Sequence, residues 1–446
     1  MKTLKSIFLL MAVLVIASCS ENKNDVDPGL GNEPEEGYLM IQVNNSQMTR
    51  ATDAGIQAER AINSLHVYLF NHDNTTPTVM HFGPDEITTT GNVTRLNNPI
   101  RTSIKDKWGY IGANLTQEMI DEINGLRNNL ISVAFTRAID EIADLPGSSF
   151  VMFTDEMLIT SANIYPTENE ANTTPVPAML RRLAVKSTVY RTDQSVFDGP
   201  GQYDLGSVEF AWRRINRRIY YIQHSTFEDP NYTAGSFVEI DRDNTQTYIT
   251  VNYNDPTLAN AQYATENTFL YNPANILTDD ATCISIRVPF QPANYTVNTG
   301  GTWQAQPNSN LPGPTAPNFW VVMVNGGVSY YFGDATTAQQ FWNEAQQGLI
   351  TVDGVVLRPD ESAPREYING WCYYNVYPNH NGIVRDEINR YNIMRNQYYR
   401  LAIRRLSAPG DPDWDFDTGQ PITEYGYIQF NLEVEDWELI DEDINM

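Results

Sequence analysis

The chain has 446 residues, which suits two or three domains of about 100–200 residues each. Hydrophobic residues make up 41% of it, so wholesale disorder is not expected. The formal net charge of −26 repels phosphate backbones and anionic membrane surfaces, which argues against nucleic-acid binding. The aromatic content of 11%, with 25 Pro and 27 Gly, favours strands and turns over a helical bundle.

The N-terminus has the pattern of a lipoprotein signal peptide, which we assign to residues 1–18. Lys2 and Lys5 precede the apolar run Ile7–Ile16, which is shorter than the ~20 residues that span a bilayer. The run leads into an Ile-Ala-Ser-Cys sequence whose cysteine is Cys19. We predict that Cys19 carries acyl chains such as palmitate, because two or more chains hold a protein stably at a membrane. The alternative is ordinary signal-peptidase cleavage nearby, with Cys19 incidental.

Residues 19–50 are predicted to be a removable segment. A polar, acidic tether comes first, and a short strand follows with Leu39, Ile41 and Val43 on one face. The next polar loop contains Arg50-Ala51, a nick site for a trypsin-like protease. A cut there would uncover roughly 5–9 kcal/mol of apolar burial, at ~1.5–3 kcal/mol for each of the three side chains. It would also leave an open row of backbone donors and acceptors.

The middle of the chain is predicted to be rich in strands. Ile62–Phe70 reads as a strand, and Leu115–Leu130 has helical spacing. Trp320–Val324 and Val328–Phe332 form a predicted hairpin, because the Asn-Gly between them supplies the positive φ angles of a tight turn. Many short strands with scattered turns predict an all-β fold of β-sandwich domains with a few short helices.

We place a domain boundary near Ile164–Pro177, where the apolar pattern is diluted. The first sandwich domain would then cover residues 51–170, and the second would cover residues 171–446.

No pattern of catalytic residues is evident. The sequence lacks a Gly-x-Ser-x-Gly elbow, a His-Glu-x-x-His pair, a P-loop and a Gly-x-Gly-x-x-Gly after a strand. None of the histidines pairs with another at metal-ligand spacing: His66, His72, His81, His224 and His380. We therefore expect no enzymatic activity and no cofactor.

A weak calcium candidate lies near the C-terminus. Asp413, Asp415, Asp417 and Glu424 occupy positions 1, 3, 5 and 12 of a loop, where oxygen ligands suit Ca²⁺. The sixth position is Thr418, where an EF-hand turn needs glycine. A solvated acidic turn is therefore the preferred interpretation, and we expect no metal.

Two further features leave alternatives open. The basic cluster Arg213, Arg214, Arg217 and Arg218 is expected to be a solvated face, or else a docking surface for the acidic end of the chain. Cys283 and Cys372 are expected to be two buried thiols rather than a disulfide, because two cysteines do not make a disulfide framework.

The last strand resembles the first. Ile41-Gln42-Val43-Asn44 and Ile428-Gln429-Phe430-Asn431 have the same alternation, so both would suit the same kind of groove. The predicted inward side chains of the last strand are Ile428, Phe430, Leu432 and Val434, with Trp437 beyond them. Adding this strand to a neighbour's groove would be β-strand addition, and head-to-tail repetition would build a filament. Alternatively, both are ordinary strands of one chain and the match is chance.

Several stretches of the sequence resemble the Bacteroidales fimbrillins, the protease-processed type V pilins, and most closely the major subunit of the short (minor) fimbriae. The matching stretches, in order, are the sequence ending in Cys19, Thr49–Thr52, Glu59–Phe70, Arg182–Lys186, Trp371–Tyr377, Arg395–Leu401 and Leu432–Trp437. The Tyr-Tyr-Asn-Val-Tyr and Arg-Asn-x-Tyr-Tyr blocks are the most specific of these.

The resemblance implies two transthyretin-like β-sandwich domains in tandem. It also implies a precursor that is lipid-anchored at the outer membrane and cut by an arginine-specific protease after Arg50, which leaves Ala51 as the mature N-terminus. The C-terminal strand would then fill the vacated groove of the adjacent subunit. Arginine specificity fits the composition, because only three lysines would remain after the cut: Lys105, Lys107 and Lys186.

The function that we expect is that of a shaft subunit in a cell-surface fimbria that supports adhesion and virulence. Its partners would be other copies of itself, other fimbrial subunits, the protease, and receptors on host or bacterial surfaces. Only the precursor would contact the membrane, through its lipid. The alternatives are a tip or accessory subunit, or a monomeric outer-membrane lipoprotein that binds glycans through exposed Trp and Tyr.

Overall fold

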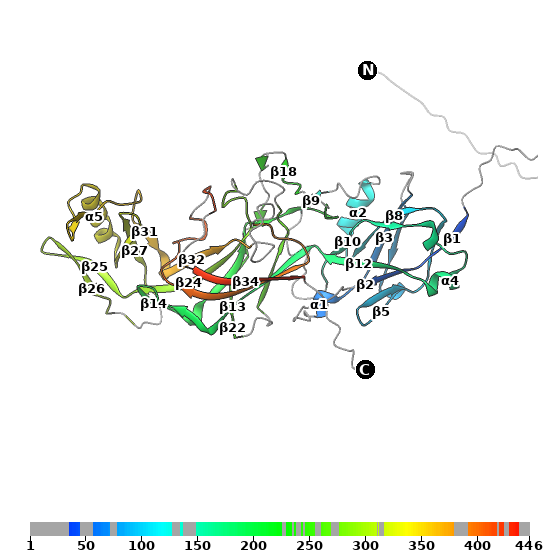
Figure 1. Ribbon diagram of the computed structural model, residues 1–446, viewed down its shortest axis with the longest axis horizontal. Helices are drawn as coiled ribbons and strands as arrows, with labels where there is room; N and C mark the ends of the chain where they lie inside the picture. Colours follow the sequence, from blue (N-terminus) through cyan, green and yellow to red (C-terminus); the bar gives the residue numbers. More distant parts are fainter. Residues whose placement is uncertain are drawn as a thin grey trace, which may run out of the picture. The chain divides into compact units, whose positions relative to one another are not determined.

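The structure is a computed structural model, and Figure 1 shows its elements in chain order. It describes residues 35–44, 57–71, 78–126, 134–136, 149–224, 229–233, 236–237, 242–243, 246–254, 260–268, 276–309, 311, 316–378, 391–416, 419–422 and 428–436. Contacts divide the chain into the units Met1–Glu35 and Glu36–Met446. The predictions made for Cys19, Arg50, Ala51, Asp417, Glu424 and Trp437 lie outside the described residues.

Strands dominate the described residues, which confirms the expected all-β class with a few short helices. The α-helices are α1 (Gln57–Arg60), α2 (Gln117–Leu126), α4 (Glu168–Thr173) and α5 (Ala335–Gln346). Single 3₁₀ turns cover Pro84–Glu86, Ser161–Asn163, Leu205–Ser207 and Ile368–Gly370. Within the described part of the chain, no helix is long and apolar enough to cross a membrane.

The first half of the described chain forms a nine-stranded sheet with the order β4-β3-β8-β10-β12-β2-β6-β5, in which β11 also pairs with β8. A separate strand pair joins β1 (Glu36–Leu39) to β7 (Ile100–Ser103). The bounds of the nine strands are β2 Ile41–Asn44, β3 Leu65–Asn71, β4 Thr78–Phe82, β5 Ile87–Thr90, β6 Val93–Leu96, β8 Lys107–Ala113, β10 Met152–Thr154, β11 Met157–Ile159 and β12 Val176–Arg182.

The second half is built on two five-stranded sheets. One has the order β22-β13-β33-β34 with β23 also on β13, and the other has the order β14-β24-β15-β21 with β32 also on β24. Trp212 on β15 and Tyr399 on β33 are both buried and meet edge to face with ring centroids 6.2 Å apart, so the two sheets share a core. The bounds are β13 Ala184–Phe197, β14 Gly201–Tyr203, β15 Glu209–Arg213, β21 Ile249–Thr250, β22 Asn252–Tyr253, β23 Ala261–Thr265, β24 Cys283–Pro292, β32 Trp371–Val376, β33 Gln397–Leu406 and β34 Ile428–Asp436.

The strand pairing passes from the first sheet to the second later in the chain than the sequence suggested. β12 pairs with β10 and β2 of the first sheet, whereas β13, which begins at Ala184, pairs with β23 and β33. The region that we took for a boundary holds α4 and a loop of the first sheet instead. A division after residue 170 therefore separates β12 from its partners.

A module is inserted between β24 and β32, and we call residues 294–367 the insert module. It has its own apolar core, which includes Phe332 and Phe341. The predicted hairpin is confirmed as β27–β28, with positive φ angles of 51° at Asn325 and 81° at Gly326. The module comprises α5 and the strands β25 Asn294–Thr299, β26 Thr302–Pro307, β27 Phe319–Val324, β28 Val328–Phe332, β29 Thr351–Val352, β30 Val355–Val356 and β31 Arg365–Tyr367.

Three two-stranded pairs complete the described strands. They are β9 (Ala134–Thr136) with β17 (Arg218–Tyr220), β16 (Ile215–Asn216) with β20 (Arg242–Asp243), and β18 (Tyr232–Thr233) with β19 (Ser236–Phe237).

Candidate assembly site

The first predicted strand lies in the interior of a sheet. β2 runs parallel to β12, with Ile41 opposite Val176, and antiparallel to β6, with Asn44 opposite Val93 (Figure 1). Both backbone edges of β2 are therefore paired. An interior strand is the one whose loss leaves two unpaired edges facing each other.

The segment that we predicted as one strand is two strands. Leu39 ends β1 and lies opposite Ile100 of β7, whereas Ile41 and Val43 belong to β2. The break falls at Met40, whose carbonyl oxygen accepts a hydrogen bond of 2.8 Å from the backbone N–H of Val176. Leu39, Ile41 and Val43 are all completely buried, so the whole segment is packed into the core.

We call the space that β1 and β2 occupy, bounded by β6, β7 and β12, the assembly slot. Neighbouring strands of a sheet lie about 4.8 Å apart, so β6 and β12 are separated by about twice that distance with β2 between them. Removal of β2 would leave room for one strand, with backbone donors and acceptors on both sides and a floor of apolar side chains.

The last strand has an open edge. Within the described chain, β34 pairs with β33 alone, in an antiparallel register that places Phe430 opposite Ile403. Ile428 is buried and Leu432 is partly buried, but Phe430 is 38% exposed. The alternating face is thus only partly covered in its own chain, and among the described strands none pairs with the outer edge of β34.

Side chains of β33 and β34 also meet across the strand pair. Glu433 lies 3.2 Å from the Arg400 guanidinium, with 55% of the Glu433 side chain exposed. Exposed ion pairs contribute about 0–1 kcal/mol, so the strand is held mainly by its backbone bonds and its inner apolar side chains. Among the described side chains, the first acidic residue of this end, Glu433, thus pairs with Arg400.

Residues from sequence blocks that are far apart in the chain contact one another in the buried core. The carboxylate of Glu59 lies 3.2 Å from the Lys186 ammonium and accepts a hydrogen bond of 2.5 Å from the Tyr263 hydroxyl. The Nε of Arg182 donates to the Glu59 carbonyl oxygen at 2.8 Å. Glu59 lies on α1, and Lys186 and Tyr263 lie on β13 and β23, so these contacts tie α1 to the second half of the chain.

Arg182 also connects this cluster to Asn396, the residue just before β33. Its backbone N–H and its Nη1 both donate to the side-chain oxygen of Asn396, at 3.2 and 3.3 Å. Asn396 has a φ of 59°, the left-handed region that asparagine tolerates better than most residues. Burial lowers the pKa of Arg182 to about 10, while the nearby Glu59 acts in the opposite direction.

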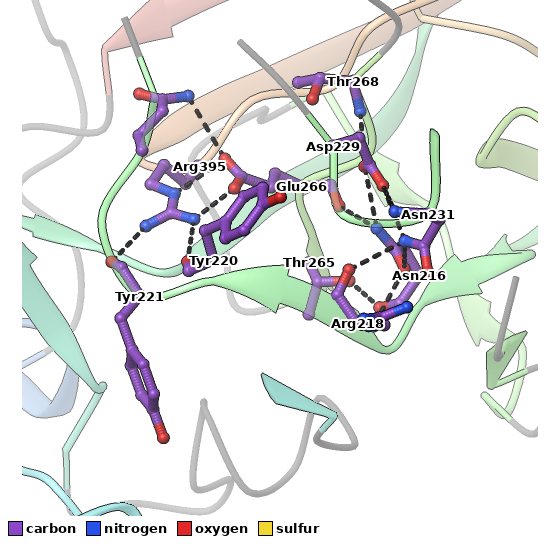
Figure 2. A network of polar contacts seen from close by, with 11 residues as sticks. Asn216, Arg218, Tyr220, Tyr221, Asp229, Asn231, Thr265, Glu266, Thr268 and Arg395 are labelled. Atoms are coloured by element: carbon purple, nitrogen blue, oxygen red, sulfur yellow. Dashed lines mark hydrogen bonds and ion pairs between the residues drawn. The ribbon is translucent and has the colours of Figure 1, made fainter. Parts of the chain in front are cut away.

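Figure 2 shows the contacts of Arg395, the first residue of the Arg-Asn-x-Tyr-Tyr block. Arg395 forms a buried ion pair with Glu266 and donates to the carbonyl oxygens of Tyr221 and Tyr220, at 2.8 and 2.5 Å. A second cluster lies beside it, in which Asp229 accepts hydrogen bonds from the backbone and side chain of Asn231. Burial raises the pKa of Asp229 to about 7. The contacts of Arg395 hold the chain just before β33, the strand with which β34 pairs.

The basic cluster forms the expected solvated face only in part, because Arg218 is exposed and Arg217 is partly buried, whereas the other two arginines are covered. Arg213 and Arg214 are buried, and the Arg213 guanidinium lies over the Tyr248 ring at 4.2 Å. Arg214 has a positive φ of 56° and pairs with Asp415 at 2.7 Å. Aromatic and acidic side chains from other elements cover both arginines.

The calcium candidate has little support from the described residues. The Asp415 carboxylate faces the cation of Arg214, which competes with a metal ion for it. No group of three or more His, Cys, Asp or Glu side chains is arranged to hold a metal within the described ranges.

The sequence-based prediction did not include one pair of titratable residues that the structure brings together. His66 on β3 and His81 on β4 lie opposite each other, with ring nitrogens 3.1 Å apart. The pairing depends on strand register, so residue spacing alone could not reveal it. Cys283 and Cys372 are both buried and unbonded to each other, as the preferred interpretation predicted.

In the described residues, the candidate assembly site thus combines a first strand that is paired on both edges with a last strand that is paired on one edge. Residues 365–443 match the family profile described as "Major fimbrial subunit protein type IV, Fimbrillin, C-terminal". The match covers β32, β33 and β34, and it confirms the resemblance that the sequence predicted. The C-terminal part of the chain, residues 365–443, is therefore similar to the C-terminal region of fimbrillins, which are major fimbrial subunits.

Solved structures with a similar strand arrangement include a fimbrilin from Porphyromonas gingivalis, with a TM-score of 0.46 at 10% identity over 91% of this chain and 98% of that one. A candidate cell adhesion protein from Parabacteroides distasonis has a TM-score of 0.47 at 11% identity over 92% and 100%. The tip fimbrial protein Mfa3 from Porphyromonas gingivalis, truncated at its C-terminus, has a TM-score of 0.38 at 13% identity over 90% and 100%. A search of curated protein sequences found no match.

Proposed function

We propose that this chain is a shaft subunit of a fimbria and that it polymerises by donor-strand exchange. The observation that carries the proposal is the position of β2, paired on one side with β12 and on the other with β6. Proteolytic loss of such a strand creates a vacancy that only another strand can satisfy, because it exposes two rows of backbone groups together.

The proposed route begins with export as a lipoprotein that is anchored at the outer membrane through Cys19. An arginine-specific protease then cuts between Arg50 and Ala51. This bond lies between Asn44, the last residue of β2, and Gln57, the first of α1. A cut there separates β1 and β2 from the body, while Glu59 keeps α1 attached to the core through Lys186.

β34 suits the role of donor. It has nine residues, and the segment from β1 to the end of β2, residues 36–44, is equally long. Among the described strands β34 has one paired edge, whereas in the β2 part of a neighbour's assembly slot it would have two. The exchange therefore gains backbone hydrogen bonds, and it buries Phe430, which is now 38% exposed.

The shaft role follows from the presence of both parts in one chain. A tip subunit needs only a slot, and an anchor subunit needs no removable strand. A subunit with both makes a heterologous contact at each end, and such contacts extend into a filament when they do not close into a ring.

The test is to cut the purified chain with an arginine-specific protease and to follow its size by light scattering and electron microscopy. We expect Ala51 as the new N-terminus and filaments in the cut sample only. Arg50→Ala is the matched control and should remain uncut and monomeric. A cut chain that stays monomeric at high concentration would show that the proposal is wrong.

A second variant lacks Tyr427–Met446. After cutting it should have a slot but no donor, so it should cap growing filaments of the intact chain and shorten them in proportion to its dose. Protein taken from cell surfaces with an intact N-terminus and lipid on Cys19 would support the monomeric lipoprotein instead.

A further inference from the structure

A cavity of about 370 Å³ lies in the insert module, outside the assembly slot. Residues of the β25–β26 hairpin line one side, and residues of β28 and α5 line the other. β25 and β28 are neighbours that belong to different sheets, so no backbone ladder closes the space between them. Volumes of roughly 300–1,000 Å³ are typical of small-molecule sites.

Aromatic rings form the apolar part of the cavity wall, and they are fixed in place. The Trp303 indole N–H donates to the Glu344 carboxylate at 2.7 Å, and its ring meets the edge of Phe341 at a centroid distance of 5.0 Å. Tyr330 packs on the other side of the module core, with its ring 4.8 Å from Phe341. Trp303 and Tyr330 remain partly exposed, so both rings contribute surface to the cavity. Rings that are already ordered lose little entropy when a ligand binds.

The polar part of the wall is neutral. Asn294 and Gln304 contribute amides, and Thr296 and Ser329 contribute hydroxyls. No lining residue is charged, although the chain carries a formal charge of −26. The lining therefore supplies no cation to pair with an anionic ligand, and the Glu344 carboxylate is already bonded to the Trp303 indole.

We propose that this cavity binds a neutral sugar ring, as the terminal pyranose of a glycan. A pyranose has an apolar C–H face, which would pack on the ring surfaces of Trp303 and Tyr330. Its hydroxyl groups both donate and accept hydrogen bonds, and amides and hydroxyls such as those of Asn294 and Gln304 satisfy both needs. An extended peptide would pair with the free edges of β25 and β28 and would not require the aromatic wall.

The cavity of a single subunit need not bind the sugar tightly. If the chain polymerises as proposed above, each shaft carries many copies, and the effective concentration of neighbouring sites raises the overall affinity for a glycan-coated surface. Only this gain rests on the proposed polymerisation, because the sugar site is complete in one chain.

The experiment uses the full-length, uncut chain, so that its outcome is independent of assembly. The probes are methyl β-galactoside, methyl β-glucoside and methyl α-mannoside, with sialyllactose as the charged comparison. Binding is measured by saturation-transfer NMR and by tryptophan fluorescence. We expect at least one neutral glycoside to bind more tightly than sialyllactose.

Two matched pairs of variants locate the binding. Ala305 is exposed and lines the cavity, so Ala305→Arg should fill it and weaken binding at least about tenfold, whereas Ala363→Arg, on an exposed loop of the same module, should not. Gln304→Ala should weaken binding, whereas Gln306→Ala, two residues along the same strand, should leave it unchanged. Circular dichroism and the melting temperature show whether each variant folds.

Three outcomes would overturn the proposal. They are no binding by any of the three neutral glycosides, equal binding by Ala305→Arg and Ala363→Arg when both are folded, or displacement of the sugar by an extended peptide that binds more tightly. Filament formation by a chain that binds no sugar would leave the proposed function intact and refute this site alone.

Discussion

The carboxylate of Glu59 lies 3.2 Å from the ammonium of Lys186, and both side chains are almost completely buried. Lys186 is one of the three lysines that would remain after cleavage at Arg50, and Lys107 is buried as well, where it donates to Asn71 at 2.6 Å. Two of these three lysines are therefore buried. The scarcity of lysine on the surface fits the proposal that the chain is processed at an arginine.

The Glu59–Lys186 pair should hold the N-terminal part of the processed chain in place. Lys186→Met removes the cation that lies beside the buried carboxylate of Glu59, while the Tyr263 hydroxyl and the nearby Arg182 stay in place. We expect a loss of about 3–5 kcal/mol in the free energy of unfolding, measured with urea. The double variant Lys186→Met with Glu59→Gln should regain part of this loss. Equal stability of Lys186→Met and the natural chain would contradict the role given to the pair.

The stability contributed by β2 should depend on cleavage. Ile41 is completely buried, so Ile41→Ala should destabilise the uncut chain by about 2–5 kcal/mol. After cleavage and removal of the released segment, the same variant should be as stable as the natural chain, because residue 41 is gone. Gln42→Ala, on the outer face of the strand, is the control. A difference that persists after the cut would mean that the segment stays bound.

Substitution of Phe430 should reduce filament formation more than it reduces the stability of the single subunit. Its side chain is 38% exposed, so Phe430→Ala should lower the stability of the uncut chain by less than about 1 kcal/mol. If β34 fills a neighbour's slot, the same change should reduce the filament yield severely. Ile428→Ala is the matched control. Because Ile428 is buried in its own chain, this variant should lower both the stability of the uncut chain and the filament yield. Normal filaments from Phe430→Ala would show that this face of β34 is not the donor face.

The histidine pair should make stability depend on pH. Burial and, to a smaller degree, His81 lower the pKa of His66 to about 4, below its ordinary value of 6.5. Between these two values the unfolded chain binds the proton more readily than the folded chain, so stability should fall as the pH is lowered from about 6.5 to 4. The melting temperature of His66→Gln should fall less over this window than that of the natural chain, at constant ionic strength. Parallel curves would contradict the prediction.

Titration of Asp229 changes the stability in the opposite direction over part of the same pH range. The effect of His66 must therefore be separated from it. The raised Asp229 pKa of about 7 exceeds the ordinary value of 3.8, so its contribution to stability falls as the pH rises between these values. The effect of His66 is therefore obtained from the difference between the two melting curves, because Asp229 contributes equally to both.

The sequence alone determined the local features of this protein. The alternation at Leu39, Ile41 and Val43 and again from Ile428 to Val434 predicted strands, and Asn325-Gly326 predicted the hairpin that the structure contains. Such features depend on neighbouring residues, so they are readable from periodicity and turn chemistry.

The tertiary structure decided which strands pair and which side chains are covered. The interior position of β2, the contact between Glu59 and Lys186, and the exposure of Phe430 all depend on residues that are far apart in the chain. The burial of Arg213 and the pairing of His66 with His81 differ from the sequence-based expectation for the same reason. Periodicity shows that a strand has an apolar face, but strand register and packing decide which partner that face meets.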